Sequence, residues 1–385
     1  MECSSAQPGQ ARPRLEVADI FRAAVPAFRD RYVPTREQLK VMAAIQRCRT
    51  MSLGGHLDVC SKCGHPRPSY NSCRNRHCPK CQCLAQARWI ARRQKRVIPT
   101  KYFHVVFTLP EPLRALARAD PVAIYDLFFE SATRTLLEFG RSRLHAQIGV
   151  TAVLHTWTRD LRFHPHVHCI VTAGGLDDDG HWVRARSRFL FSVKAMAKVF
   201  RGKFVDGLAT LMGHSSQFAE LKPGLYDREW VVYAKQPFGG AAQVFQYLGR
   251  YTHRVGISNH RLVSFDGLEV CFRTKHGKTC TVAAVEFIRR FLLHVLPAHF
   301  VKIRHYGLVA AANVGSKLET ARACLLACDD KHQPPASSET PPSWRDLLRA
   351  LTGLDLFVCP VCGARSMRSC PFGPGITPAG SLDTS

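Results

Sequence analysis

The chain has 385 residues, 46% of them hydrophobic, and a formal net charge of +25 from 54 basic and 29 acidic side chains. The apolar fraction excludes a disordered chain, and the length predicts two or three domains. No run of 18 apolar residues occurs, which excludes a membrane-spanning helix. The positive charge favours a polyanionic partner such as nucleic acid, although a general RNA-binding protein would share it.

The N-terminal part is expected to be helical and to lead into a metal-binding segment. Residues 15–50 have helical periodicity, with Thr35 as the expected N-cap of a second helix. The chain has 16 cysteines, but its first residues contain no apolar signal core. We therefore expect a cytoplasmic protein, in which clustered cysteines more often hold metal than form disulfides.

Residues 54–83 are dense in cysteine, histidine, proline and glycine and have few apolar side chains to form a core. Two CxxC pairs, which are typical zinc ligands, are separated here by 14 residues. They are Cys60 with Cys63 and Cys78 with Cys81. We expect all four thiolates to share one structural Zn²⁺, with Cys73 and His77 as further candidates for an alternative or second site. Cys359 and Cys362 form half of another zinc site, which Cys370, Cys324 or Cys328 could complete.

A basic helix is predicted directly after the cysteine-rich segment, over residues 84–98. It carries five basic side chains and no acidic one, namely Arg88, Arg92, Arg93, Lys95 and Arg96. Charge runs of this kind are usually solvated helix faces, but the lack of any acid favours contact with DNA phosphates.

From residue 102 onward, short strands interleave with longer helices. Strands are predicted at 102–109, 149–158, 165–173 and 228–235, and a hairpin at 268–285. A helix over residues 121–140 is expected to end at Gly140. This pattern predicts an α+β fold with an antiparallel sheet flanked by helices, preceded by an N-terminal helical and zinc-binding module.

Three histidines repeat at every second residue in the predicted strand FHPHVHCIV, so that they share one face. A lone histidine is more often a structural residue than a ligand, but burying three without a partner would be costly. His155 on the preceding strand can join His166 and His168 around one metal ion, provided that the register of the hairpin is right. His164 is the alternative ligand. Three histidines with open coordination positions define a catalytic rather than a structural site.

Two tyrosines stand four residues apart on a predicted helix over residues 240–254, and so share a face. These are Tyr247 and Tyr251. Arg250 and Arg254 form a second pair with the same spacing alongside them and are candidates for DNA binding. Such pairs usually pack, but a metal site and a basic chain beside them favour phosphoryl transfer to tyrosine.

The ordered motifs FHVVFTLP, HTW, HPHVHCIVTAGGL, YLGRYTHR and RFLLHVLP, after a cysteine-rich module, resemble the IS91-type rolling-circle transposases. These belong to the two-tyrosine branch of the HUH endonuclease superfamily, and their insertion-sequence common-region relatives share the pattern. The resemblance covers about residues 30–310. It implies a five-stranded antiparallel sheet, Mg²⁺ or Mn²⁺, single-stranded DNA as substrate, and 5′-phosphotyrosine intermediates with a free 3′ hydroxyl.

Carried over by residue, the resemblance assigns His166 and His168 as metal ligands and Tyr247 and Tyr251 as nucleophiles. The third ligand is His155 or a residue of the tyrosine helix, where Gln243, Gln246 and His253 are available.

We expect three domains: 1–100 (helical and zinc-binding), 101–310 (catalytic) and 311–385 (linker and CPVCG tail). The expected function is a transposase that nicks and rejoins single-stranded DNA at the ends of a mobile element, in the bacterial cytoplasm at the nucleoid. A replication initiator or relaxase with the same chemistry, or a non-catalytic zinc-dependent nucleic-acid-binding protein, is the alternative. No membrane is expected to be involved.

Overall fold

The computed structural model describes residues 14–93, 96–185, 190–213, 215–238, 256–327, 343–353 and 355–376. Its helices are α1 (Val17–Arg31), α2 (Arg36–Arg47), α3 (Gln82–Arg93), α4 (Arg114–Ala119), α5 (Pro121–Leu144), α6 (Val193–Met212), α7 (Ser216–Tyr226), α9 (Ala284–Leu292), α10 (Lys317–Ala327) and α11 (Trp344–Thr352). Its strands are β1 (Gly55–Cys60), β2 (Pro66–Tyr70), β3 (Tyr102–Thr108), β4 (Gln147–Trp157), β5 (Phe163–Leu176), β6 (Trp182–Arg184), β7 (Val232–Phe238), β8 (Leu262–Phe265), β9 (Glu269–Arg273), β10 (Thr279–Ala283), β11 (Ile303–Gly307) and β12 (Met367–Phe372).

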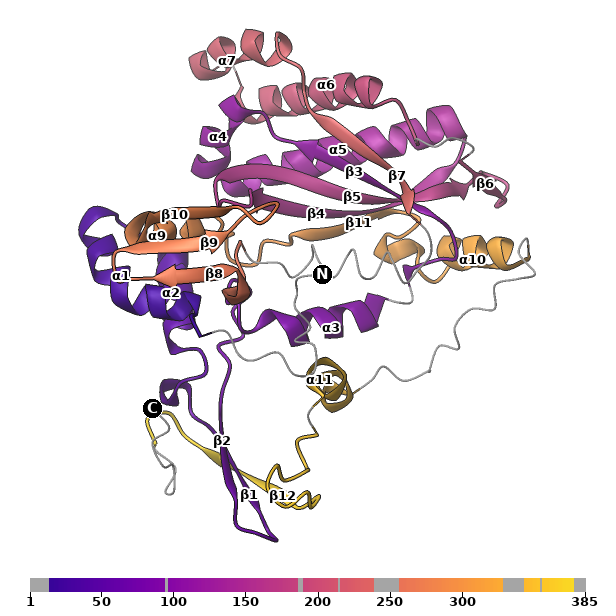
Figure 1. Ribbon diagram of the computed structural model, residues 1–385. Helices are drawn as coiled ribbons and strands as arrows, with labels where there is room; N and C mark the ends of the chain where they lie inside the picture. The colour runs from indigo at the N-terminus through magenta and orange to yellow at the C-terminus, as the bar shows by residue number, and fades with distance from the viewer. Residues whose placement is uncertain are drawn as a thin grey trace.

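The largest sheet has the strand order β11-β4-β5-β3-β7, with β6 paired to the far end of β5. All its pairings are antiparallel. Figure 1 shows α5, α6 and α7 above this sheet and α3 and α10 on its other side. The predicted α+β fold, an antiparallel sheet flanked by helices, is thereby confirmed.

The central strand β5 presents a different chemistry on each face, because successive side chains of a strand point to opposite sides. Val167, Cys169 and Val171 lie in the apolar core that α5 and α6 build against the sheet. The alternate residues His166 and His168 therefore face away from that core, and farther along the same face Ile170 packs with residues of α10.

A second, smaller sheet packs with the N-terminal helices rather than with the large sheet. Its order is β10-β9-β8, and its core residues Val270 and Phe272 share one apolar cluster with Phe21 of α1 and Ile45 of α2. This cluster joins residues 17–48 to residues 257–292, so it crosses the expected domain boundary at residue 100. Thr35 caps α2 as predicted, since its hydroxyl accepts the Gln38 N–H.

The hairpin β1–β2 projects away from both sheets and is joined there by β12 near the C-terminus, as Figure 1 shows. All pairings of the three strands are antiparallel, and β2 and β12 are largely exposed.

The expected end of the long helix at Gly140 is wrong, because α5 continues to Leu144 and is capped by His145 in the left-handed region. A β-carbon at Gly140 would lie 3.1 Å from the Ala146 carbonyl oxygen and from Ile148 Cγ1. Gly140 therefore allows β4 to pass close to the helix rather than ending it. In the described residues, no helix is long and apolar enough to cross a membrane.

Candidate functional site

Three histidines converge on the face of the large sheet that points away from α5. His155 of β4 lies directly opposite His166 of β5, and His168 is the next residue on that face. Their nitrogen ligand atoms all lie within 4.8 Å of one another. The side chains of His155 and His168 are 3% and 8% exposed, so a bound ion would sit at the edge of a largely dry site.

Backbone and side-chain hydrogen bonds orient two of these rings. His166 Nδ1 lies 2.7 Å from the carbonyl oxygen of His164. A carbonyl can only accept, so Nδ1 carries the proton and Nε2 of the neutral ring keeps its lone pair. His168 Nδ1 lies 2.8 Å from Nε2 of His104, a buried residue of β3. Both arrangements leave Nε2 as the nitrogen of the ring that can hold a metal.

Burial keeps the imidazoles of His166 and His104 neutral at neutral pH. It lowers the pKa of His166 to about 4 and that of His104 to about 3. A neutral ring is the form that binds a metal, so no proton has to leave the His166 ring when an ion binds.

His164, the alternative ligand, has a different position. Its Nδ1 accepts a hydrogen bond of 2.9 Å from the Arg114 guanidinium, and its side chain is not part of the three-histidine group. Burial and the neighbouring Arg114 charge lower the pKa of His164. His164 thus contributes its carbonyl oxygen to the orientation of His166, while its ring is held by Arg114.

The turn that joins the two histidine strands is held by hydrogen bonds from residues outside the sheet. Arg261 Nη2, Arg290 Nη1 and His294 Nε2 donate to three consecutive carbonyls of this turn, those of Arg159, Asp160 and Leu161 respectively. His294 Nδ1 in turn accepts from the Thr156 hydroxyl at 3.2 Å. Arg261, α9 and His294 just beyond it therefore hold the end of the hairpin on which His155 and His166 lie.

The predicted tyrosine helix lies outside the described residues. Tyr247, Tyr251, Arg250 and Arg254 all fall in residues 239–255, as do the alternative ligands Gln243, Gln246 and His253. The described chain resumes at Gly256, five residues after Tyr251. A β-carbon there would lie 3.0 Å from Leu161, at the turn between the histidine strands.

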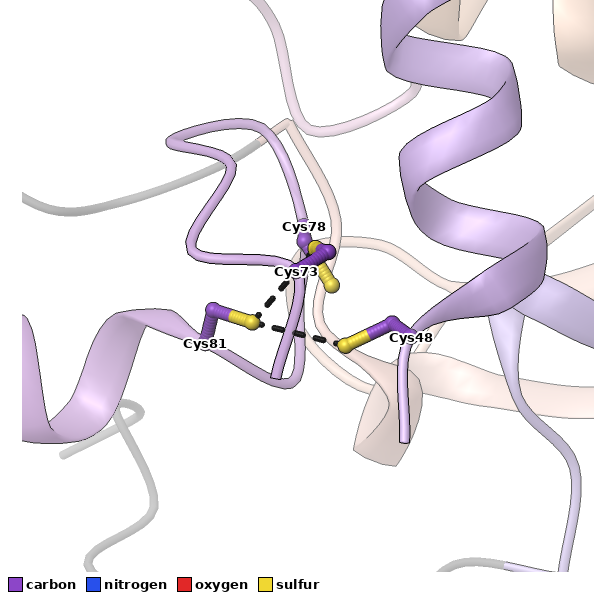
Figure 2. A group of neighbouring side chains, drawn as sticks. All are labelled: Cys48, Cys73, Cys78 and Cys81. Atoms are coloured by element: carbon purple, nitrogen blue, oxygen red, sulfur yellow. Dashed lines mark hydrogen bonds between the residues drawn. The ribbon is translucent and has the colours of Figure 1, made fainter. Parts of the chain in front are cut away.

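Four cysteines gather where α2 ends and α3 begins, as Figure 2 shows. They are Cys48, Cys73, Cys78 and Cys81, whose sulfur atoms all lie within 4.8 Å of one another. Cys81 Sγ lies 3.4 Å from Cys48 Sγ and 3.6 Å from Cys73 Sγ. In tetrahedral Zn²⁺ coordination with Zn–S bonds of about 2.3 Å, two sulfurs are about 3.8 Å apart. The cluster therefore has the donor atoms and approximate size of a closed structural zinc site.

Hydrogen bonds among the four thiols make some of them easier and others harder to deprotonate. Hydrogen bonding with the Cys73 thiol lowers the pKa of Cys48 to about 7, whereas hydrogen bonding with Cys48 raises the pKa of Cys78. Four thiolates this close would repel one another, and a divalent cation removes that repulsion.

The expectation that Cys60, Cys63, Cys78 and Cys81 share one ion is wrong. Cys60 and Cys63 lie at the tip of the β1–β2 hairpin, while Cys78 and Cys81 lie beyond its base. The six-residue strand β1 between these ends is about 20 Å long. Cys60 and Cys63 instead approach Cys359 and Cys362.

Two other candidate ligands are placed by the structure. Cys73 belongs to the first cluster, but the half-buried side chain of His77 accepts the Leu296 N–H at 3.4 Å and is not in either cysteine group. Spacing alone did not identify Cys48, which stands 12 residues before the first CxxC pair. The only feature of the sequence that could have pointed to Cys48 as a ligand was its position at the end of a predicted helix, close to the cysteine-rich segment.

The basic helix α3 forms as predicted and is described from Gln82 to Arg93. Arg88 is exposed on it, whereas Arg96 beyond its end donates to the Val309 carbonyl at 3.4 Å. Lys95 and the side chains of Arg92 and Arg93 lie outside the described part of the chain.

Comparison with known proteins agrees with this arrangement of sites. Residues 20–109 match the family "Transposase zinc-binding domain", and residues 149–317 match the family "Putative transposase". The chain is 42% identical over 402 residues to "Putative transposase y4qJ" of Sinorhizobium fredii (strain NBRC 101917 / NGR234), covering 97% of this chain and all of that protein. It is 27% identical over 348 residues to "Transposase for insertion sequence element IS801" of Pseudomonas savastanoi pv. phaseolicola, covering 85% of this chain and 82% of that one. No solved structure gives a significant match.

The matched families define a transposase with an N-terminal zinc-binding domain, a class of enzyme that acts on DNA. The chain belongs to the IS91-type transposases.

Proposed function

We propose that this transposase nicks and rejoins single-stranded DNA at the ends of its mobile element through 5′-phosphotyrosine intermediates, in rolling-circle transposition. The observation that carries the proposal is the group of His155, His166 and His168. It combines three imidazoles, little exposure and hydrogen bonds that leave metal-binding nitrogens. Such a set is typical of a catalytic metal site.

The residues fit a divalent ion, and among the two expected ions they fit Mn²⁺ better than Mg²⁺. All three donors are imidazole nitrogens, whereas Mg²⁺ prefers oxygen. A bound divalent ion would polarise the scissile phosphate and stabilise the charge that develops on it. His104 would accept the Nδ1 proton of His168 and so present Nε2 toward the ion.

In the proposed reaction, the phenolate oxygen of Tyr247 or Tyr251 attacks the scissile phosphorus. The new bond is a 5′-phosphotyrosine, and the bond that breaks releases the 3′ oxygen as a hydroxyl after it gains a proton. Attack by a 3′ hydroxyl on that phosphotyrosine reverses the chemistry and joins strands. Two tyrosines on one helix face allow two such transfers in succession.

The charge of the chain supports DNA as the partner, because +25 is enough to attract a polyanion strongly. We assign Arg88, Arg92, Arg93, Lys95, Arg96, Arg250 and Arg254 to DNA binding. We further propose that residues 101–310 form the catalytic domain and that the enzyme acts at the nucleoid in the bacterial cytoplasm.

The proposal is tested by a covalent adduct assay with the full chain. Labelled single-stranded DNA from the ends of the element is incubated with Mn²⁺ or Mg²⁺ and run on a denaturing gel. We expect a labelled band at protein size that EDTA abolishes and that Tyr247→Phe combined with Tyr251→Phe abolishes. DNA that is bound in native gels but returns intact with either metal would favour a non-catalytic nucleic-acid-binding protein.

A further inference from the structure

We propose that Cys60, Cys63, Cys359 and Cys362 bind a second structural Zn²⁺, which fastens the C-terminal segment of the chain to the N-terminal hairpin. This site is separate from the cysteine cluster at α2 and α3 and does not depend on the proposed DNA chemistry. Its contacting cysteines are 302 and 296 positions apart in the sequence.

The four sulfurs have the spacing of a tetrahedral zinc site. Cys60 Sγ lies 3.6 Å from Cys362 Sγ, and Cys63 Sγ lies 3.6 Å from Cys359 Sγ. The expected separation around Zn²⁺ is about 3.8 Å, whereas a disulfide would require about 2.05 Å. All four are free thiols, and their sulfurs lie within 4.8 Å of one another.

The two CxxC turns have the same backbone hydrogen bonds, although they come from opposite ends of the chain. In the first, the Cys60 N–H donates to the His65 carbonyl, and the Gly64 N–H donates to the Cys60 carbonyl. In the second, the Cys359 N–H donates to Ala364 and the Gly363 N–H to Cys359, at the same positions of the turn.

Each turn closes on a glycine in the left-handed region, with φ of 72° at Gly64 and 68° at Gly363. A residue with a β-carbon would be strained there. In the second turn the Val361 N–H also points to Cys359 Sγ at 3.4 Å, a contact that stabilises a thiolate. The turns formed by CSKCG and CPVCG therefore each direct two sulfur atoms toward one point.

The surrounding contacts bring the two turns together. β12 pairs with β1 in an antiparallel register that places Met367 opposite Cys60. The Ser61 N–H donates to the Ser366 carbonyl at 3.0 Å, and the Ser366 hydroxyl lies 3.2 Å from Cys60 Sγ. On the other side of the hairpin, Arg67 Nη2 donates to the Leu356 carbonyl at 2.7 Å. Figure 1 shows β12 alongside β1 at the end of the hairpin.

Apolar burial is too small here to hold the three strands. The local core consists of Cys60, Cys359 and Met367, with Cys362 packed against them. Three of these four residues are themselves candidate ligands. A unit of this size ordinarily needs a metal or disulfides to stay folded, and the sulfur separations exclude disulfides.

The three cysteines that the sequence offered as partners of Cys359 and Cys362 are not shown in this site. Cys370 pairs across the sheet with Leu57 and is exposed, and Cys324 Sγ donates to the Gly180 carbonyl far along the chain. Cys328 lies outside the described residues. Cys370 and Cys324 therefore serve as controls.

The test measures zinc per chain in the purified full-length protein. We expect two zinc ions in the wild type and one after Cys359→Ser combined with Cys362→Ser. The matched control, Cys324→Ser combined with Cys370→Ser, removes two cysteines from the same part of the chain and should keep two. One zinc in the wild type, or two in the Cys359/Cys362 variant, would overturn the proposal.

A second measurement needs no variant and so covers the case in which the substituted chain fails to fold. The wild-type protein is treated with N-ethylmaleimide before and after chelation, and each cysteine is followed by peptide mass spectrometry. We expect Cys60, Cys63, Cys359 and Cys362 to be protected together and to become reactive together when zinc is removed. Cys370 should react in both states. Reaction of Cys359 and Cys362 in the zinc-loaded protein as fast as that of Cys370 would contradict a shared site.

Discussion

His155 and His166 lie directly opposite each other across the antiparallel pair β4–β5, with ring centroids 5.5 Å apart. This register decides whether the neighbouring strand contributes a ligand, because a shift of one residue would turn His155 into the core under α5. The turn between the strands is held through consecutive carbonyls by Arg261, Arg290 and His294. The relation between the two histidines is thus stabilised from the turn beside them.

Replacing His155 with alanine should lower Mn²⁺ affinity and adduct formation by about 10- to 100-fold or more, because one of three ligands is lost. The binding of Mn²⁺ by calorimetry and the adduct yield would measure this. His276→Ala, at the exposed turn between β9 and β10 and outside every candidate metal group, is the control and should have no effect. Equal affinities in His155→Ala and wild type would assign the third ligand to another residue.

His104 is expected to act through His168 rather than on DNA. His104→Ala should weaken Mn²⁺ binding by about 10- to 100-fold, since the hydrogen bond that orients the His168 ring is removed. Raising the Mn²⁺ concentration should restore the adduct yield, and His104→Gln, which keeps an acceptor, should lose less. Failure of excess Mn²⁺ to restore activity in a folded variant would speak against this positioning role.

The first zinc cluster should be required for the N-terminal core. Cys48 is fully buried at the end of α2, so Cys48→Ser should remove one zinc per chain and markedly lower the thermal midpoint. Zinc content and thermal unfolding would be measured together. Cys280→Ser lies against the same apolar cluster and should keep both zinc and midpoint nearly unchanged. A Cys48→Ser protein with normal zinc content would contradict the assignment.

Stability should fall as the pH is lowered from about 6.5 toward about 4. Burial lowers the pKa of His294 to about 4, against an ordinary value of about 6.5. Within this window the unfolded chain binds a proton that the folded chain does not, so lower pH favours unfolding, by at most about 1.4 kcal/mol per pH unit for this residue.

Denaturant unfolding at several pH values would test the contribution of His294. We expect His294→Gln to be less stable at pH 7, because the contacts to Thr156 and Leu161 are altered, but to have a shallower pH dependence below pH 6.5. An unchanged slope would show that other groups cause the acid sensitivity.

The histidine site could be predicted because it depends on local rules. Alternation along FHPHVHCIV and a short turn place the three rings together without knowledge of the rest of the fold. His104 was not identified, although it lies at a strand position, because a single histidine in a strand carries no signal until its neighbour across the sheet is known.

The division of the cysteines could not be predicted from spacing. Two CxxC pairs 14 residues apart are typical of one site, yet the strand β2 between Cys63 and Cys73 separates them, and each pair finds partners elsewhere. Likewise, the apolar faces of α1 and α2 indicate burial but do not say that their partner is the sheet of residues 262–283. Both outcomes depend on contacts between distant segments, which local patterns do not encode.

The central claim is that a tyrosine of this chain becomes covalently linked to DNA, and peptide mass spectrometry of the adduct tests it most directly. The wild-type protein would be incubated with single-stranded DNA from the element ends and Mn²⁺, then treated with nuclease and protease. We predict a nucleotide phosphate on Tyr247 or Tyr251 that is absent in His166→Ala. A nucleotide on another residue, or nicked DNA without any modified peptide, would contradict the account.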